Sequence, residues 1–270
     1  MRVIEFQTEP IFEFRYLNAG RGPGQFYEDR LPVHHARVDR LPAGVSALVA
    51  TADLQGRERF EDSVGGNIRL LGEALPERLA REVLPSLGLH DPQQVGVLLA
   101  GDFYTVPALD KRGGTGDVTR VWQAFGETFA WVAGVAGNHD TFGHPPQKRP
   151  RFPQHLHYLD GDAIVIGGMS LAGLGGIIGK ATRPNRRSED DYLHALSQLM
   201  QQRPEIVLLH DGPDGPDAGQ RGLARVREIL LAAAPTLLIR GHAHWGQPFA
   251  EYANGLQIVN VDARVVVLTT

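Results

Sequence analysis

The sequence contains no cysteine in its 270 residues, which excludes a disulfide framework, a zinc ribbon and a thiol nucleophile. Any metal ion must therefore be held by His, Asp, Glu, Asn or Gln. No uninterrupted run of 18 apolar residues occurs, and the first residues lack the apolar core of a signal peptide. The net charge of -4 is too mild for a basic nucleic-acid-binding surface or a membrane-surface binder. We expect a soluble, cytoplasmic protein.

The apolar fraction of 42% suits one globular domain of roughly 200 to 250 residues with a smaller addition. Apolar and polar residues alternate with period two near the start of the chain, at Ile4 and Phe6 and again from Phe12 to Tyr16, which predicts two strands. We interpret residues 1–44 as an N-terminal β appendage and residues 45–270 as the main domain. His34 and His35 are adjacent in sequence and are predicted to be surface or turn residues.

From residue 45 onward, short apolar runs alternate with stretches of helical periodicity. This pattern is typical of strands that are buried on both faces. Strands are predicted at residues 45–52, 95–100, 130–135, 206–209 and 236–239. Helices are predicted at residues 67–87 with an interruption at Pro76, and at residues 118–128, 190–202 and 218–233. Further β-like runs at residues 163–167, 169–174, 248–252, 256–261 and 264–268 indicate a second sheet. The predicted fold class is α/β, a two-sheet sandwich flanked by helices.

Polar side chains follow the five buried runs at the same relative position. They are Asp53 after the first run, Asp102 after the second, Asn138, His139 and Asp140 after the third, His210 after the fourth, and His242 and His244 after the fifth. Because the carboxyl ends of parallel strands face a common crevice, we expect these residues to converge. A single Asp or His after a strand is more often a turn residue, but five such loops are poorly explained by coincidence.

Carboxylates, imidazoles and an amide without cysteine indicate a divalent metal centre. Asp102 could bridge two ions through its two oxygens. Two ions, two Asp ligands and a bridging hydroxide leave a net charge of about +1, which attracts phosphate and stabilises the charge of its transition state. Manganese is the first expectation for the metal, with iron and zinc as alternatives. Phosphoester hydrolysis is the natural use of such a centre.

The motifs Gly101-Asp102, Gly137-Asn138-His139-Asp140, His210 and Gly241-His242-Ala243-His244 resemble those of the calcineurin-like metallophosphoesterase superfamily in order, spacing and strand context. The resemblance covers roughly residues 45–270 and implies that superfamily's four-layer fold. It implies that Asp53 and His244 bind the first metal, that Asp102 bridges, and that Asn138, His210 and His242 bind the second. It also implies that His139 protonates or stabilises the leaving oxygen, with Asp140 or another acceptor fixing its ring.

One position departs from the superfamily pattern, because Asp53-Leu54-Gln55 stands where Asp-x-His is usual. Gln55 offers a neutral oxygen donor, which suits Mn or Mg better than Zn or Fe. Three interpretations remain open. Gln55 ligates the first metal as a variant, or it leaves that metal loosely held, or it marks a protein that has lost catalysis. Retention of Asp53, His139 and His244 argues against the last.

Two groups outside these motifs are candidates for substrate binding. Arg183, Arg186 and Arg187 precede the helix predicted at residues 190–202, where Ser188 is its expected N-cap, and could grip a phosphate. A solvated charge run explains them equally well. His144 lies in a Gly- and Pro-containing loop after Asp140 and could line the crevice.

The leading hypothesis is a dinuclear-metal phosphoesterase in which a metal-bridging hydroxide attacks phosphorus while His139 assists the leaving group. A phosphodiester, either a small molecule or a nucleotide, is slightly preferred over a monoester. The alternatives are a nuclease of the same superfamily, which the charge does not favour, and a metal-binding regulatory scaffold with little turnover.

Overall fold

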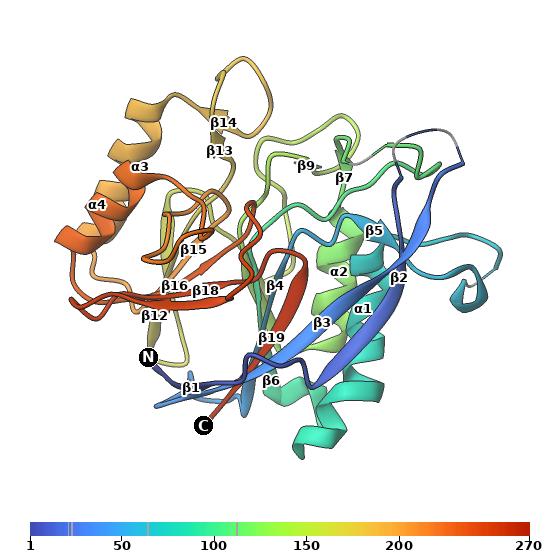
Figure 1. Cartoon of the computed structure of the whole chain (residues 1–270), viewed down its shortest axis with the longest axis horizontal. Coiled ribbons are helices and arrows are strands. Elements are labelled where there is room, and N and C mark those ends of the chain that lie inside the picture. Colours follow the sequence, from blue (N-terminus) through green and yellow to red (C-terminus); the bar gives the residue numbers. More distant parts are fainter. Residues whose placement is uncertain (21, 23, 64, 112) are drawn as a thin grey trace.

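Two β-sheets pack face to face between two pairs of helices in this computed structural model, which describes residues 1–20, 22, 24–63, 65–111 and 113–270 (Figure 1). Helices α1 (Leu71–Arg78) and α2 (Thr119–Thr128) cover the larger sheet, and α3 (Glu189–Gln201) and α4 (Ala224–Ala232) cover the smaller one. The predicted α/β architecture, a two-sheet sandwich flanked by helices, is confirmed.

The larger sheet has nine strands in the described part of the chain, in the order β10-β8-β6-β4-β19-β3-β2-β5, with β1 paired to β3. Strands β4, β6, β8 and β10 run parallel to one another, and β19 is antiparallel to β4. The strands are β1 (Val3–Phe6), β2 (Phe12–Asn18), β3 (Tyr27–Val38), β4 (Ala47–Ala52), β5 (Gly56–Arg57), β6 (Val95–Leu99), β8 (Trp131–Gly134), β10 (Leu156–Tyr158) and β19 (Arg264–Thr269).

The smaller sheet has the strand order β11-β12-β15-β16-β18-β17, and its four inner strands are parallel. Its strands are β11 (Asp162–Ile166), β12 (Met169–Leu174), β15 (Ile206–Leu209), β16 (Leu237–Arg240), β17 (Phe249–Glu251) and β18 (Gln257–Asn260). Two short parallel pairs lie at the upper edge of the molecule in Figure 1: β7 (Gly116–Asp117) with β9 (Asp140–Thr141), and β13 (Ile177–Ile178) with β14 (Arg186–Arg187).

The strands are apolar on both faces because each face packs against a different layer. In β4, Val49 packs toward α1 and α2, whereas Leu48 packs between the two sheets. In β15, Leu208 faces the larger sheet and Leu209 faces α3 and α4. Three apolar layers therefore hold four layers of secondary structure together, and burial of this surface at roughly 25 cal/mol per Å² is the main stabilising contribution.

The helix predicted at residues 67–87 is not interrupted at Pro76, which lies inside α1. The helical path continues as a π-helical turn (Leu79–Val83) and a 3-10 turn (Leu84–Leu87), which ends at Gly88 with a left-handed φ of 75°. Proline removes one backbone hydrogen bond, but Leu75, Leu79 and Val83 are fully buried. Burial of this apolar face therefore outweighs the loss. Other short 3-10 turns are Phe60–Asp62 and Pro92–Gln94.

The sequence predicts the first residue of α3 better than that of α4. The predicted N-cap of α3 is confirmed, since the Ser188 side chain accepts a hydrogen bond from the backbone N–H of Asp191. The helix predicted at residues 218–233 begins only at Ala224. The residues before it form a loop in which the carbonyl of Arg221 accepts hydrogen bonds from Arg240 and Trp245.

The N-terminal residues form part of the larger sheet. Strand β3, which the sequence analysis did not identify, pairs with β19 in parallel and with β2 in antiparallel orientation. Both predicted surface histidines lie in β3, and His34 is only 5% exposed. The prediction of a surface or turn position for His34 is therefore wrong, because β1 and the ring of Phe6 pack beside it.

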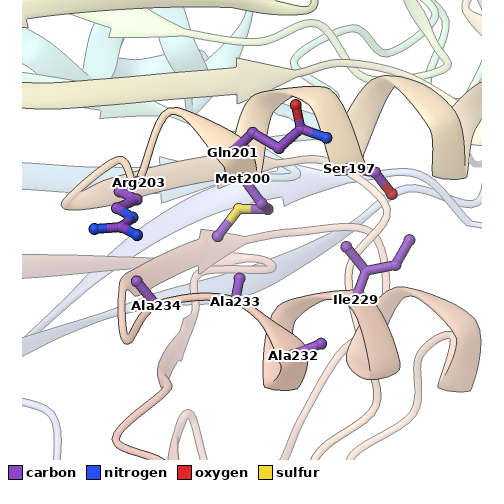
Figure 2. A pocket seen from close by; sticks show the side chains of 8 residues that line it. All are labelled: Ser197, Met200, Gln201, Arg203, Ile229, Ala232, Ala233 and Ala234. Carbon is purple, nitrogen blue, oxygen red and sulfur yellow. The ribbon is translucent and has the colours of Figure 1, made fainter.

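The smaller sheet leaves a groove of about 490 Å³ on its helical side, between α3 and α4. Figure 2 shows that Met200, Ile229 and three alanines border this groove, with Arg203 as the charged side chain at one end. Its described lining residues include no His, Asp or Glu. Separately, none of the described helices is long and apolar enough to cross a membrane.

Candidate metal centre

The candidate functional residues lie in loops at the carboxyl ends of parallel strands from both sheets. Asp53 follows β4, Asp102 follows β6, and His210 and His242 follow β15 and β16. The backbone N–H of His242 donates to Asp53 Oδ2 at 2.8 Å, and His210 Nε2 lies 3.3 Å from Asp102 Oδ2. The fold thus brings together residues as far apart as 189 positions in the sequence.

These loops line a polar cavity of about 280 Å³, which we call the metal cavity. Its lining residues come from the N-terminal strands as well as from the strand-end loops, and they are Tyr16, Asn18, Asp53, Gln55, Asp102, Gly113, His139, His242, Asp262 and Ala263. Three carboxylates and two imidazoles in one cavity form a donor set of the kind that divalent cations bind.

Part of this donor set is already arranged at metal-binding distances. In the part of the chain that the structure describes, ligand atoms of Asp102, His210 and His242 all lie within 4.8 Å of one another. Two buried atoms nearby, His210 Nε2 and Asn138 Oδ1, have no hydrogen-bond partner among the described residues. An unsatisfied buried polar atom costs about 1–3 kcal/mol. A cation held by Asp102, His210 and His242 would satisfy His210 Nε2, so these three side chains fit a divalent ion, and Asn138 Oδ1 is a further oxygen donor without a hydrogen bond.

The electrostatics of the cavity also favour a cation. Nδ1 of His210 is fixed by a hydrogen bond of 2.7 Å to the carbonyl of Ala100. Burial lowers the pKa of His210, but attraction to the Asp102 and Asp53 carboxylates together with the hydrogen bond to Ala100 outweighs burial and raises this pKa to about 10. Burial likewise acts to raise the pKa of Asp102, and attraction to His210 reverses the effect and lowers it. A site that holds a proton this strongly on a buried ring attracts positive charge.

Three of the candidate ligands have strained backbones. The φ angles are 55° at Asp53, 61° at Asp102 and 67° at His242, in the left-handed region that non-glycine residues seldom adopt. Each such conformation costs of order 1–3 kcal/mol and persists only where the surrounding structure enforces it. The three loops therefore hold their side chains in position at a cost in stability.

Two glycines make room for the carboxylates. A Cβ atom at Gly137 would lie 2.0 Å from Asp102 Oδ1, and a Cβ at Gly241 would lie 2.4 Å from Asp53 Oδ2. Neither glycine has a positive φ, so the reason for glycine at both positions is space. The glycines that precede Asn138 and His242 thus allow the ligand loops to approach the neighbouring carboxylates.

On the side predicted for the first metal, the donors are less tightly grouped. The side-chain amide of Gln55 lies against Asp102 and donates from Nε2 to Oδ2 at 3.3 Å. Rotation of this amide by half a turn would present its oxygen instead. Nδ1 of His244 lies 3.3 Å from Asp262 Oδ1, and Nη2 of Arg264 is 3.1 Å from His244 Nε2. His244 therefore contacts Asp262 and Arg264, and it is not part of the group formed by Asp102, His210 and His242.

His139 is held with one ring nitrogen toward the cavity. Its backbone N–H donates to Asp102 Oδ1 at 2.8 Å, and its ring Nδ1 lies 2.6 Å from the carbonyl of Gly114. Since a carbonyl can only accept, Nδ1 carries the proton in this contact. Nε2 then lies 4.0 Å from Asp102 Oδ2, and the side chain is 31% exposed. The acceptor that fixes the ring is thus Gly114 and not Asp140.

Asp140 has a different position from the one expected of a catalytic carboxylate. It is 1% exposed, and its oxygens accept hydrogen bonds from the backbone N–H groups of Asp102, Phe103 and Gly137. Burial, and then repulsion by Asp102, raises its pKa to about 6. Asp140 therefore ties the loop after β6 to the loop after β8 and positions the residues that face the cavity.

The sequence analysis missed Asp262, which also follows a parallel strand, β18. Its carboxylate lines the metal cavity. Burial is the main cause that raises the pKa of Asp53 well above its usual value, and repulsion by Asp262 is the next. Asp53 and His210 are predicted site residues because each follows a buried parallel strand. The same rule, applied to the end of β18, predicts Asp262.

The candidate substrate-binding residues are not in this cavity. Arg183, Arg186 and Arg187 line a separate cavity of about 320 Å³, which shares none of its described lining residues with the metal cavity. His144 is exposed, and among the described residues it does not line the metal cavity.

Comparison with known proteins agrees with the geometry of this centre. A family model for calcineurin-like phosphoesterases matches residues 42–246. A comparison with curated proteins finds no match. The matched range includes the strand-end loops from Asp53 to His244 and leaves out β1 to β3 and Asp262. Because this model covers more than half of the sequence, the chain belongs to the calcineurin-like phosphoesterase family.

Proposed function

We propose that this protein hydrolyses a phosphodiester with the help of two divalent metal ions. Family membership implies metal-dependent phosphoester hydrolysis, and the choice of a diester and of two ions is our proposal. The observation that carries it is the group of Asp102, His210 and His242, whose ligand atoms lie within 4.8 Å of one another, together with two buried atoms that form no hydrogen bond, His210 Nε2 and Asn138 Oδ1.

The candidate ligands divide into two sets with one shared member. Asp53, Gln55 and His244 would hold the first ion, Asn138, His210 and His242 would hold the second, and Asp102 would contact both. When bound, the ions supply an activated water and stabilise the charge on the phosphoryl oxygens.

Manganese is our proposal for the metal because oxygen donors dominate one side of the centre. The carboxylates of Asp53 and Asp262 and the Gln55 amide all line the cavity there. Mn binds hard oxygen donors better than it binds softer nitrogen and sulfur donors, whereas Zn prefers nitrogen and sulfur. The His244 ring is the one imidazole assigned to this side.

In our proposal, His139 protonates the leaving group. The carbonyl of Gly114 fixes Nδ1, so Nε2 is the nitrogen that faces the cavity near Asp102. In its protonated form, Nε2 donates a proton to the departing alkoxide oxygen, and the bond between phosphorus and that oxygen breaks as the proton is transferred. General acid catalysis of this kind contributes typically about 10² to 10⁴-fold to the rate.

The surroundings of the centre favour a diester because they leave room for a second organic group. A neighbouring cavity of about 540 Å³ shares Tyr16, Asn18 and Ala263 with the metal cavity. Tyr16 and Asn18 belong to β2, and Asn18 Nδ2 donates to Asp29 Oδ2 at 2.9 Å, which fixes this wall. The N-terminal strands thus give the cleft a polar side that the family model does not include.

The experiment compares leaving groups in wild type and in His139→Ala, both reconstituted with Mn. We expect the variant to keep its Mn content and to lose about 10² to 10⁴-fold in rate on alkyl diesters, with a smaller loss on nitrophenyl diesters, whose leaving group needs less assistance. His194→Ala is the matched control, since His194 is exposed on α3, and it should behave as wild type.

Two outcomes would count against the proposal. Equal losses on both classes of diester would remove His139 from the role of general acid. Binding of Mn without hydrolysis of any phosphoester would favour a regulatory scaffold.

A further inference from the structure

A strongly basic cavity of about 320 Å³ is lined by both residues of β14, which pairs with β13. This strand pair lies at the upper edge of the molecule in Figure 1. Four cationic side chains and one carboxylate are among its described lining residues, namely Lys148, Arg183, Arg186, Arg187 and Asp160. This concentration of positive charge stands out in a chain whose net charge is -4.

Only one of the four cations is neutralised. Arg187 Nη2 lies 2.8 Å from both oxygens of Asp160, and its Nη1 donates to the carbonyl of Gly175 at 2.9 Å. Lys148, Arg183 and Arg186 form no ion pair with any described residue. The cavity therefore has a fixed ion pair on its wall and three cations whose charge no described carboxylate balances.

The wall of this cavity is joined to the loop that carries Asn138 and His139. Asn185, which lines the cavity, has a left-handed φ of 50°. Its Nδ2 donates to the carbonyl of Gly137 at 2.9 Å and to the carbonyl of Asp140 at 2.6 Å. A ligand in the basic cavity would thus contact a segment that supports the metal loop while remaining outside the metal cavity.

We propose that this cavity is a second anion site, separate from the metal centre, which binds a phosphate or pyrophosphate group. Guanidinium groups bind phosphate oxygens with two parallel hydrogen bonds. Phosphate groups carry a charge of about -2 near pH 7, and pyrophosphate carries a larger negative charge. Three unbalanced cations match such a ligand better than they match a single carboxylate. The anion is either free in solution or the distal phosphate of a substrate.

Binding of pyrophosphate to chelator-stripped protein tests the site without any metal. Calorimetry should show binding to wild type and to Asp102→Asn. The double variant Arg183→Ala/Arg186→Ala should bind at least about 10-fold more weakly, since each charge-assisted hydrogen bond contributes on this scale. Arg225→Ala is the matched control, because Arg225 is an exposed arginine on α4 paired with Glu189, and it should bind as wild type.

Two results would overturn the proposal. The first is equal pyrophosphate affinity in the double variant and in wild type. The second is a clear gain in pyrophosphate affinity in Asp102→Asn, which would place the anion at the metal centre, since loss of a carboxylate there strengthens the binding of an anion in the absence of metal. Neither result depends on hydrolysis, so failure here is distinct from failure of the proposed function.

Steady-state kinetics then separates the two sources of the anion. If it is the distal phosphate of a substrate, the double variant should raise the KM for a dinucleoside polyphosphate more than the KM for an aryl diester. An independent anion should leave the ratio of the two KM values unchanged.

Discussion

Replacing Gly137 by alanine tests whether the space beside Asp102 is needed for metal binding. The new Cβ would lie 2.0 Å from Asp102 Oδ1 and 2.4 Å from its backbone nitrogen. Real contacts of this kind are not shorter than 3.0 Å, so the carboxylate must move by about 1 Å. Metal sites tolerate about 0.2 Å in ligand distance. The variant therefore displaces Asp102, the proposed shared ligand, without changing any of the proposed ligating residues.

The expected loss of Mn affinity is at least about 10 to 100-fold, the range found when the groups that orient metal ligands are disturbed. The crowding itself should cost about 1–3 kcal/mol of unfolding free energy, so circular dichroism should still show a folded protein. Calorimetric titration of Mn into the stripped variant measures the affinity. Gly241→Ala crowds Asp53 Oδ2 and the Cβ of Ala52 but not Asp102, and it should weaken one ion more than the other.

The control is Gly246→Ala, because a Cβ at Gly246 would meet no atom within 4 Å. It should bind Mn as wild type does. If folded Gly137→Ala also titrates like wild type, Asp102 does not bind metal in the position that the structure gives it, and the reasoning is refuted.

Two further predictions concern Gln55 and His34. Gln55→His should tighten the first metal site and shift its preference from Mn toward Zn or Fe, because imidazole nitrogen replaces an amide oxygen, whereas Gln55→Ala should weaken it; identical metal titrations for all three proteins would place Gln55 outside the site. Burial, and then Arg264, lowers the pKa of His34, so the folded state disfavours protonation and loses stability as pH falls below the unfolded value of about 6.5. Urea midpoints at pH 7.5 and pH 5 should differ more for wild type than for His34→Gln, and parallel shifts would contradict this.

The strand-end residues were predictable because one geometric rule governs them all. Parallel strands place their carboxyl ends together, so Asp53, Asp102 and His210 could be grouped before their contacts were known. Asp262 obeys the same rule, but it follows the run at residues 256–261, which the sequence indicates only as part of a second sheet.

Other features depend on contacts between distant segments, which periodicity does not reveal. Strand β3 contains Pro32, a residue that argues against an interior strand. It is tolerated because Pro32 lies where β3 pairs with β2, just before the pairing with β19 begins at Val33. Likewise, nothing in the local sequence indicates that the carbonyl of Gly114 fixes the ring of His139.

If hydrolysis depends on a metal pair that shares Asp102, metal content and diester hydrolysis measured on the same preparation test this dependence most directly. Chelator-stripped protein should be inactive, and activity should return as close to two Mn ions bind per chain. Asp102→Asn should regain neither the ions nor the activity. Full hydrolysis by stripped protein, or two ions bound by Asp102→Asn with wild-type affinity, would contradict a metal pair that depends on Asp102.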